Sequence, residues 1–228
     1  MHLPEMSLPV QWAAGWFGLS LPAVLVGMKR LKKRAKEDKL VKPLVGLMAA
    51  TVFIISLFPI PLPYGTSSHA IGTPLAAIIV GPWMATLLSV IALFLQAVFF
   101  AHGGLTTLGA NVFSMGIVGS FVSYGLFKSL RKMQLPLVLA VGISAFVGDL
   151  AVYLVTSLQL ALALHDTKPL WDVWVKFLLI FMPTQLPLAL VEGIFTGGVF
   201  GYLKQIRPDI LLRIGLNFKQ AGDGNETL

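Results

Sequence analysis

Long apolar runs constrain this chain more than any other feature. Six stretches are long enough to cross the hydrocarbon core of a membrane as helices. They cover residues 9–28, 43–60, 70–101, 111–127, 135–164 and 173–203. Charged residues make up only 12% of the chain, whereas soluble domains carry about 25%. In water such a chain would expose large hydrophobic patches. We therefore predict an all-α, polytopic helical bundle in a membrane.

Basic residues predict how the bundle is oriented. Fifteen of the seventeen Lys and Arg residues fall into three groups, at 29–42, 128–132 and 204–219. Such groups mark cytoplasmic loops. All three share one side only if the run 70–101 breaks into two short segments at Gly81-Pro82, and proline disfavours helix at the residue before it. The sequence therefore predicts about seven transmembrane segments, with the N-terminus outside and the C-terminus inside.

The organisation of the chain is simple. One transmembrane domain is expected over residues 1–219, followed by a polar tail, 220–228, whose composition is typical of disorder. Gly193, Gly197 and Gly201 recur every four residues, a spacing that serves either close helix packing or the docking of a partner subunit. We expect the protein to be a multi-pass protein of the inner (plasma) membrane.

Histidines gather on the side opposite the basic groups. In the predicted orientation all four lie at outer ends of segments or in outer loops, namely His2, His69, His102 and His165. His165 lies beside Asp166 in a short loop and is expected to be a solvated surface residue. The chain has no cysteine, which excludes thiolate metal ligands and cysteine catalysis.

The first two residues form the most specific pattern. The α-amine of Met1, the backbone nitrogen of His2 and its imidazole Nδ1 can wrap one metal ion in fused chelate rings. Met1 is expected to be retained because His2 is large. A nitrogen-rich square plane points to Ni(II) or Cu(II), and away from tetrahedral Zn(II). Residues 1–8 are thus a candidate metal-chelating terminus; the alternative is a solvated terminal histidine.

His69 can supply the fourth ligand of that plane. It follows Ser67 and Ser68, which can orient it by hydrogen bonds. The alternative for this stretch is a helix N-cap, with one of the serines capping. His102 and Asn111 lie in a Gly- and Thr-rich bend, where we expect Asn111 to support the backbone. Both are also candidates for supporting the metal ligands without binding the ion themselves. A ligand role for His102 remains the alternative.

Two acids, Asp149 and Glu192, lie within apolar spans. Such residues serve either as functional groups, for example a proton relay, or as hydrogen-bonding links between helices. The sequence contains no nucleotide-binding motif and no recognisable hydrolase motif. We therefore expect a protein that is not an enzyme, with any ATP hydrolysis in a separate subunit.

Five stretches carry a family resemblance. They read MHLPE, SSHAIGTPLAAIIVGPW, AHGGLTTLGANVFSMGIVG, GDLAVYLVTSLQLALA and TQLPLALVEGIFTG. In this order they resemble the cobalt/nickel substrate-binding subunits, CbiM and NikM, of energy-coupling factor (ECF) transporters. The likeness covers most of the chain and leaves out only the first basic group and the tail.

The resemblance implies a function. The family has seven transmembrane helices, and its outer N-terminus folds into the pocket. Carried over, the metal ligands are Met1, His2 and His69, and the substrate is Co(II) or Ni(II), with no organic cofactor. The bend at His102 is more similar to the cobalt branch of the family, and GTSSHAIG is more similar to the nickel branch. We favour cobalt as the substrate, and we expect the imported cobalt to supply cobalamin biosynthesis. The implied partners are a CbiN-like small membrane subunit, a CbiQ-like coupling subunit and CbiO-like ATPases. A proton-coupled secondary transporter is the remaining alternative.

Overall fold

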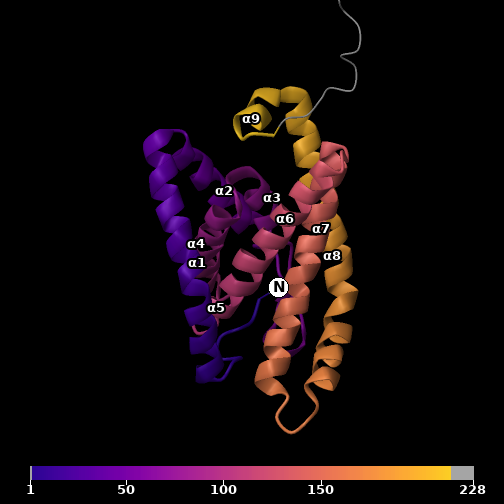
Figure 1. Ribbon diagram of the computed structural model, residues 1–228. Helices are drawn as coiled ribbons and strands as arrows, with labels where there is room; N and C mark the ends of the chain where they lie inside the picture. Colours follow the sequence, from indigo (N-terminus) through magenta and orange to yellow (C-terminus); the bar gives the residue numbers. More distant parts are fainter. Residues whose placement is uncertain (1, 217–228) are drawn as a thin grey trace, which may run out of the picture.

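The structure, a computed structural model, describes residues 2–216 and is an all-helical membrane bundle (Figure 1). Among the described residues, five helical runs are long and apolar enough to span a membrane, and a shorter apolar helix accompanies them. The long runs are α1 (Val10–Glu37), α4 (Pro82–Phe100), Leu108–Lys132, α7 (Leu137–Leu164) and α8 (Leu170–Ile206), and the shorter helix is α2 (Val41–Ile55). The predicted polytopic fold is confirmed. Met1 and the predicted tail lie outside the described residues.

The predicted break at Gly81-Pro82 is confirmed. Helix α3 (Thr73–Val80) ends there and α4 begins at Pro82. Gly81 has a φ of 91°, which an L side chain rarely adopts, so glycine makes the turn between the helices. The two segments are unequal, since α3 has eight residues and α4 has nineteen. The short α3 is almost wholly buried, as expected of a half-length segment inside a membrane protein.

The run from Leu108 to Lys132 is one span of changing helical geometry. It starts as α5 (Leu108–Asn111), continues as the π-helical stretch η2 (Val112–Gly119) and ends as α6 (Ser120–Lys132). A Cβ at Gly116 would lie 2.1 Å from the Ser89 hydroxyl of α4, so the two helices touch at their backbones. Wide π turns are often found near functional sites.

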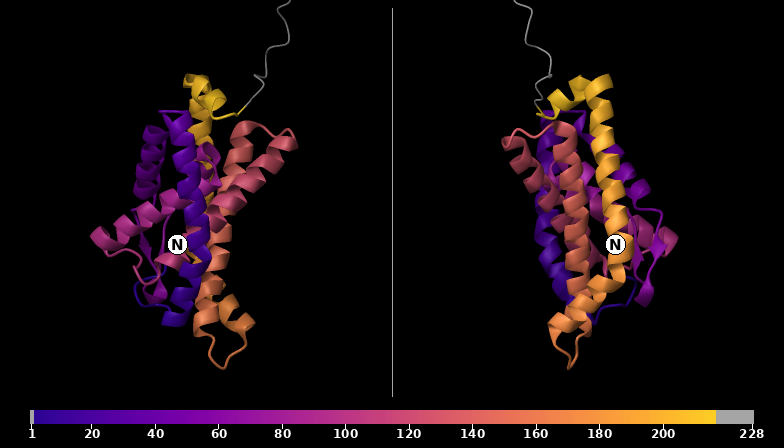
Figure 2. Two further views of the ribbon diagram at one scale, coloured as in Figure 1. Left: turned by 60° about the vertical axis from the view of Figure 1, so that its left-hand side comes forward. Right: turned by 90° about the vertical axis from the view of Figure 1, so that its right-hand side faces the viewer.

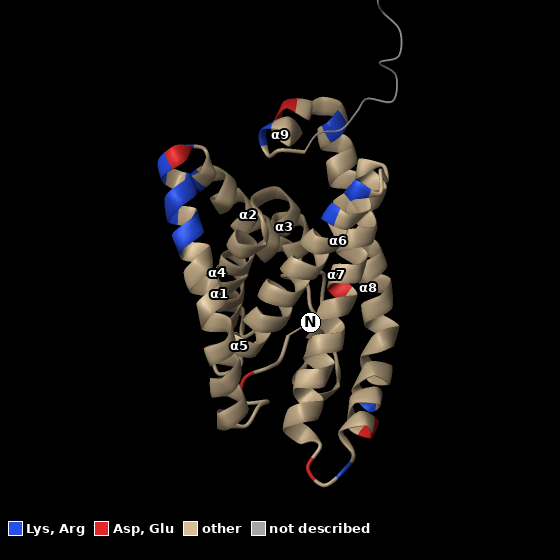
Figure 3. Cartoon of the chain, viewed as in Figure 1, with Lys and Arg blue, Asp and Glu red and all other residues tan. Residues whose placement is uncertain are grey.

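Helix α1 is longer than the sequence predicted. The first basic group was expected to be a connection, but residues up to Glu37 continue the helix. Lys and Arg are good helix formers, so a charged stretch leaving the membrane can remain helical. Figure 3 shows Lys and Arg residues of α1, α6 and the last turn of α8 at one end of the bundle, where the short helix α9 (Pro208–Arg213) also lies. A further basic residue lies near the opposite end of α8.

Helices α7 and α8 form a close antiparallel pair, seen side by side in Figure 2. A Cβ at Gly193 would lie 2.9 Å from the Gly142 carbonyl oxygen, and one at Gly197 would lie 3.1 Å from that of Val138. The glycine row therefore serves packing within the chain. The alternative expectation, that Gly193 and Gly197 form a docking face for a partner, is wrong because α7 already covers them.

A small sheet links the chain's beginning to the loop before α3. Strand β1 (Ile60–Pro61) pairs antiparallel with β2 (Ser67–Ser68) across the turn η1 (Pro63–Gly65). His2 pairs with the other edge of β2, opposite Ser67. The chain leading into α1 therefore starts in the interior of the bundle, as Figure 1 shows. This pairing brings the first residues beside the loop that carries His69.

Candidate metal centre

The first residues are held by side chains of the bend after α4. Asn111 accepts the Leu3 N–H at Oδ1 (2.8 Å) and donates from Nδ2 to the Leu3 carbonyl oxygen (3.0 Å). The Thr107 hydroxyl donates to the same carbonyl at 2.8 Å. Leu3 is fully buried, so both of its backbone polar groups depend on these partners. Asn111 thus holds the terminal segment that carries His2, and its own side chain is taken up by these hydrogen bonds.

Glu5 fastens the next part of the segment. Its carboxylate accepts the backbone N–H groups of Leu105 and Thr106, and the Met6 N–H donates to the Thr106 hydroxyl at 3.0 Å. The contact is possible only at a glycine: a Cβ on Gly104 would lie 2.5 Å from the Glu5 Cα atom. Residues 2–6, which we name the N-terminal strap, therefore lie flat against the 101–107 bend.

A second set of bonds fixes the loop that carries His69. Glu192 of α8 accepts the backbone N–H groups of Ile71 and Gly72 at 2.7 and 2.8 Å, so its carboxylate clamps the chain just beyond the histidine. Gly72 occupies the left-handed region, with a φ of 67°. The backbone around His69 is therefore tied directly to α8.

The residue before the histidine is tied to the same helix pair. The Ser68 hydroxyl donates to Gln185 Oε1 at 2.7 Å, and Gln185 Nε2 donates to Asp149 Oδ2 at 2.7 Å. All three residues are buried. The chain of bonds joins β2 to α8 and α7. Asp149 and Glu192 thus act as hydrogen-bonding links between the His69 loop and the helices.

Between the strap and this loop, three imidazoles meet. The ring centroids of His2 and His69 are 4.3 Å apart, those of His2 and His102 4.6 Å, and those of His69 and His102 5.2 Å. One nitrogen from each ring can be chosen so that all three lie within 4.8 Å of one another. His2 and His69 are 1% and 0% exposed, and His102 is half-buried.

The ring nitrogens are available as donors. Both ring nitrogens of His2 and Nε2 of His69 are buried without a hydrogen-bond partner, a costly state unless something binds them. His69 Nδ1 lies 2.8 Å from the Ala70 carbonyl oxygen, which fixes the proton on Nδ1 and leaves the Nε2 lone pair facing the other rings. Neutral imidazoles with free lone pairs are what a transition metal ion binds.

Electrostatics favour the neutral form of all three rings. Burial lowers the pKa of His2 and of His69 well below the usual value, and the neighbouring His69 ring lowers the pKa of His2 further. Burial also lowers the pKa of His102, to about 4. Protons therefore compete weakly with a metal ion for these nitrogens near neutral pH.

The other predicted site residues take supporting positions. The Ser67 carbonyl accepts the His2 N–H at 3.0 Å, and the Ser67 hydroxyl lies 3.4 Å from His102 Nε2. The His2 N–H would have to leave this carbonyl and lose its proton before its nitrogen could bind a metal. Met1, the first predicted ligand, lies outside the described residues. His165 lies at the end of α7, away from the cluster.

Sequence reasoning missed two residues of this arrangement. Gln185 carries the link from Ser68 to Asp149, and only its location in an apolar run set it apart in the sequence. Glu5 is the second of these residues. Its carboxylate accepts backbone N–H groups of a bend that is distant in the sequence, and no pattern of side chains predicts such a contact.

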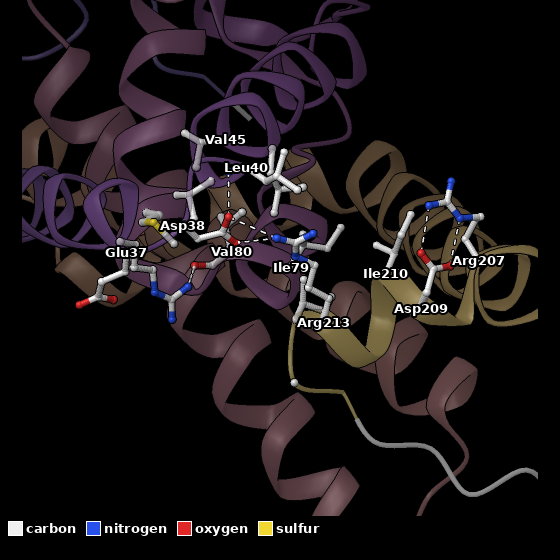
Figure 4. Close-up of a pocket in the computed structure, with 16 residues that line it drawn as sticks. Glu37, Asp38, Leu40, Val45, Ile79, Val80, Arg207, Asp209, Ile210 and Arg213 are labelled. Atoms are coloured by element: carbon white, nitrogen blue, oxygen red, sulfur yellow. Dashed lines mark hydrogen bonds and ion pairs between the residues drawn. The ribbon is translucent and has the colours of Figure 1, made fainter.

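A cavity of a different kind lies at the basic end of the bundle. It has a volume of about 590 Å³ and lies between the end of α1, α2, the α3–α4 break and α9 (Figure 4). Two of its acids face arginines: Asp38 is 3.1 Å from Arg213, and Asp209 is 3.0 Å from Arg207. Paired carboxylates of this kind are poor metal donors, so the histidine cluster is the better candidate.

The geometry is that of a nitrogen-lined metal site in a membrane bundle, and comparison with known proteins agrees. Residues 2–210 match the family described as "CbiM: Cobalt uptake substrate-specific transmembrane region". The chain belongs to the CbiM family. It is accordingly a multi-pass membrane protein of a cobalt uptake family, as its apolar helices indicate.

Individual relatives of the CbiM family match most of the chain. A "Cobalt transport protein CbiM" of Sorangium cellulosum is 47% identical over 215 residues, which are 94% of this chain and 96% of that protein. Another, of Geobacter sulfurreducens, is 44% identical over 217 residues, or 95% of this chain. The chain spans 63% of the length of the Geobacter protein.

Two crystal structures share the fold. One, described as a transition metal transporter, superposes with a TM-score of 0.82 at 33% identity and covers 93% of this chain and 96% of that one. The other, described as a truncated transition metal transporter, gives a TM-score of 0.80 at 34% identity and covers 90% of this chain and 99% of that one. The helical arrangement is therefore that of solved transporters of transition metals.

Proposed function

We propose that this protein is the substrate-specific subunit of an ECF-type importer and captures Co(II) on the outer side of the plasma membrane. The observation that carries the proposal is the group of unpartnered imidazole nitrogens of His2 and His69, buried beside the strap. Neutral nitrogen donors select late transition metals over the hard cations that prefer oxygen. Family membership favours cobalt among them.

In this proposal the ion is held in a plane of four nitrogens. The Met1 amine, the His2 backbone nitrogen and the His2 imidazole supply three, and His69 Nε2 supplies the fourth. The closeness of the His2 and His69 rings, whose centroids are 4.3 Å apart, supports this ligand set, and forming it requires the His2 N–H to leave the Ser67 carbonyl. Ni(II) suits the same plane and is the alternative substrate.

The membrane orientation follows from the same proposal. The three basic groups face the cytoplasm and the histidine cluster opens to the outside, with the N-terminus outside and residues 1–219 forming one domain. Energy comes from ATP hydrolysed in CbiO-like subunits, through a CbiQ-like coupling subunit and with a CbiN-like small subunit. The imported cobalt serves cobalamin biosynthesis.

The engagement of the two intramembrane acids supports this mechanism over a proton-coupled one. Both Glu192 oxygens accept backbone N–H groups, and Asp149 accepts from Gln185. Glu192 thus holds the backbone beside His69, and Asp149 Oδ2 holds the Gln185 side chain. A proton carrier would have to break those bonds in each cycle.

Extension of the N-terminus tests the proposal. A residue added before Met1 converts the amine into an amide and moves the imidazole one place along the chelate. Protein carrying such an extension should lose Co(II) binding, whereas the same tag after Leu228 should leave it intact. Metal content and competition among Co(II), Ni(II), Cu(II) and Zn(II) are measured on both proteins. Equal binding by both would refute the terminal chelate.

A further inference from the structure

The imidazole of His102 is the third of the cluster, and the local backbone conformation holds it there. His102 follows Ala101, which ends α4 in the left-handed region with a φ of 48°, and precedes Gly103, which has a φ of 80°. The His102 N–H donates to the Gln96 carbonyl oxygen at 3.2 Å. Two unusual backbone conformations in three residues turn the chain so that this ring faces the other two. Non-glycine residues adopt positive φ only where the surroundings impose it.

The distances between the ring centroids indicate which coordination positions the three imidazoles can occupy around one ion. Two imidazoles bound at adjacent positions, with metal–nitrogen bonds of about 2 Å, have ring centroids about 4.5 Å apart, and at opposite positions over 6 Å apart. His2 is 4.6 Å from His102 and 4.3 Å from His69, and His69 is 5.2 Å from His102. The three rings are therefore mutually adjacent around a common point.

Adjacency to both rings leaves one kind of position for His102. In the proposed plane, the His2 ring and His69 are neighbours. The position in that plane next to His69 and opposite the His2 ring belongs to the Met1 amine, and the position opposite His69 belongs to the His2 backbone nitrogen. A ligand adjacent to both imidazoles must then lie above or below the plane.

We propose that His102 is an axial ligand that makes the site prefer Co(II) over Ni(II). The inference rests on the proposed function, because it takes the four-nitrogen plane as given. Ni(II) with eight d electrons is satisfied by a strong square plane and gains little from an axial donor. Co(II) has one electron fewer and readily takes a fifth ligand. The axial imidazole therefore stabilises one ion and not the other.

The position of His102 suits this role. It is half-buried, whereas His2 and His69 are enclosed, so it stands on the more open side of the cluster. The Ser67 hydroxyl lies 3.4 Å from its Nε2 and can orient the ring. A ligand on the open side of the site can bind an entering ion before the ligands of the strap complete the plane.

The test compares His102→Ala with wild type, both with the native N-terminus and purified in detergent. His165→Ala is the matched control, since that histidine lies outside the cluster. Competition titrations give the affinities for Co(II) and Ni(II). We expect Co(II) affinity to fall by about tenfold to a hundredfold, the scale on which groups around a metal affect its binding, while Ni(II) affinity is retained. Retained Ni(II) binding also shows that the variant is folded.

Electron paramagnetic resonance of bound Co(II) reads the axial position directly. In a strong square plane the unpaired electron of Co(II) points along the axis, so an axial nitrogen splits the signal. We expect this splitting in wild type and in His165→Ala, and its loss in His102→Ala. An unchanged affinity ratio and spectrum, or an equal loss of both metals, would overturn the axial assignment. Failure of the wild type to bind Co(II) would instead refute the proposed function.

Discussion

Replacing Asn111 by alanine isolates the energetic role of the strap. The Asn111 side chain makes two hydrogen bonds to the Leu3 peptide, at 2.8 and 3.0 Å, in a fully buried place. In Asn111→Ala the Leu3 N–H loses its partner, while the Leu3 carbonyl keeps the Thr107 hydroxyl. No metal ligand is changed, so any loss of metal affinity must come from the strap.

The size of the effect follows from these contacts. An unsatisfied buried N–H costs about 1–3 kcal/mol, and the second lost bond about 0.5–1.5 kcal/mol. The strap is therefore destabilised by about 1.5–4.5 kcal/mol in its docked position, a shift of about tenfold to two-thousandfold in the docking equilibrium. Metal affinity falls by the same factor once the undocked form predominates, because only the docked form binds.

Two measurements follow this prediction. Competition with a coloured chelator gives the Co(II) affinity, and hydrogen exchange reports the protection of the Leu3 amide. Thr86→Ala is the control, because it removes a buried hydroxyl that donates to the Pro82 and Gly116 carbonyls at 3.0 and 2.9 Å, away from the strap. If Asn111→Ala retains both wild-type affinity and Leu3 protection, the strap is held by something else and the reasoning is wrong.

Two further predictions concern the same loops. Gly104→Ala should displace the strap and weaken Co(II) binding, because its Cβ would lie 2.5 Å from the Glu5 Cα atom, whereas Gly198→Ala has no atom within 4 Å and should bind as wild type in the same titration. Glu192→Gln should lower both the thermal stability and the Co(II) affinity of the purified protein, because a glutamine has one acceptor oxygen for the two N–H groups that the carboxylate now holds. If this variant instead binds Co(II) normally and its transport rate loses the dependence on pH, Glu192 is a proton carrier.

The spans and the break could be predicted because each depends on local chemistry. Apolar runs report their length directly, and proline disfavours helix at the residue before it, which favours a break at Gly81-Pro82. The length of α1 could not be predicted, because a basic stretch reads equally well as a loop and as the exposed end of a helix. Its helical state depends on whether the chain continues straight out of the membrane.

The candidate site was foreseeable in part. His2 and His69 could be expected on one side, since the predicted topology puts both at outer ends. The closeness of His102 could not, because it depends on the positive φ of Ala101 and on a bend that meets the strap. The same holds for Asn111, whose amide was expected to support its own bend. It bonds Thr107 of that bend, and it also holds Leu3, more than a hundred residues away in the sequence.

The construction of the strap bears on how an ion could leave. Every helix of the bundle is closed by its own internal hydrogen bonds, but residues 2–6 are joined to the rest by a handful of bonds to side chains and loop backbone. Peeling this segment away opens one wall of the site and breaks no turn of helix. Such local openings cost far less free energy than unfolding. Because His2 is part of the strap, the movement that opens the site also removes a ligand from the ion.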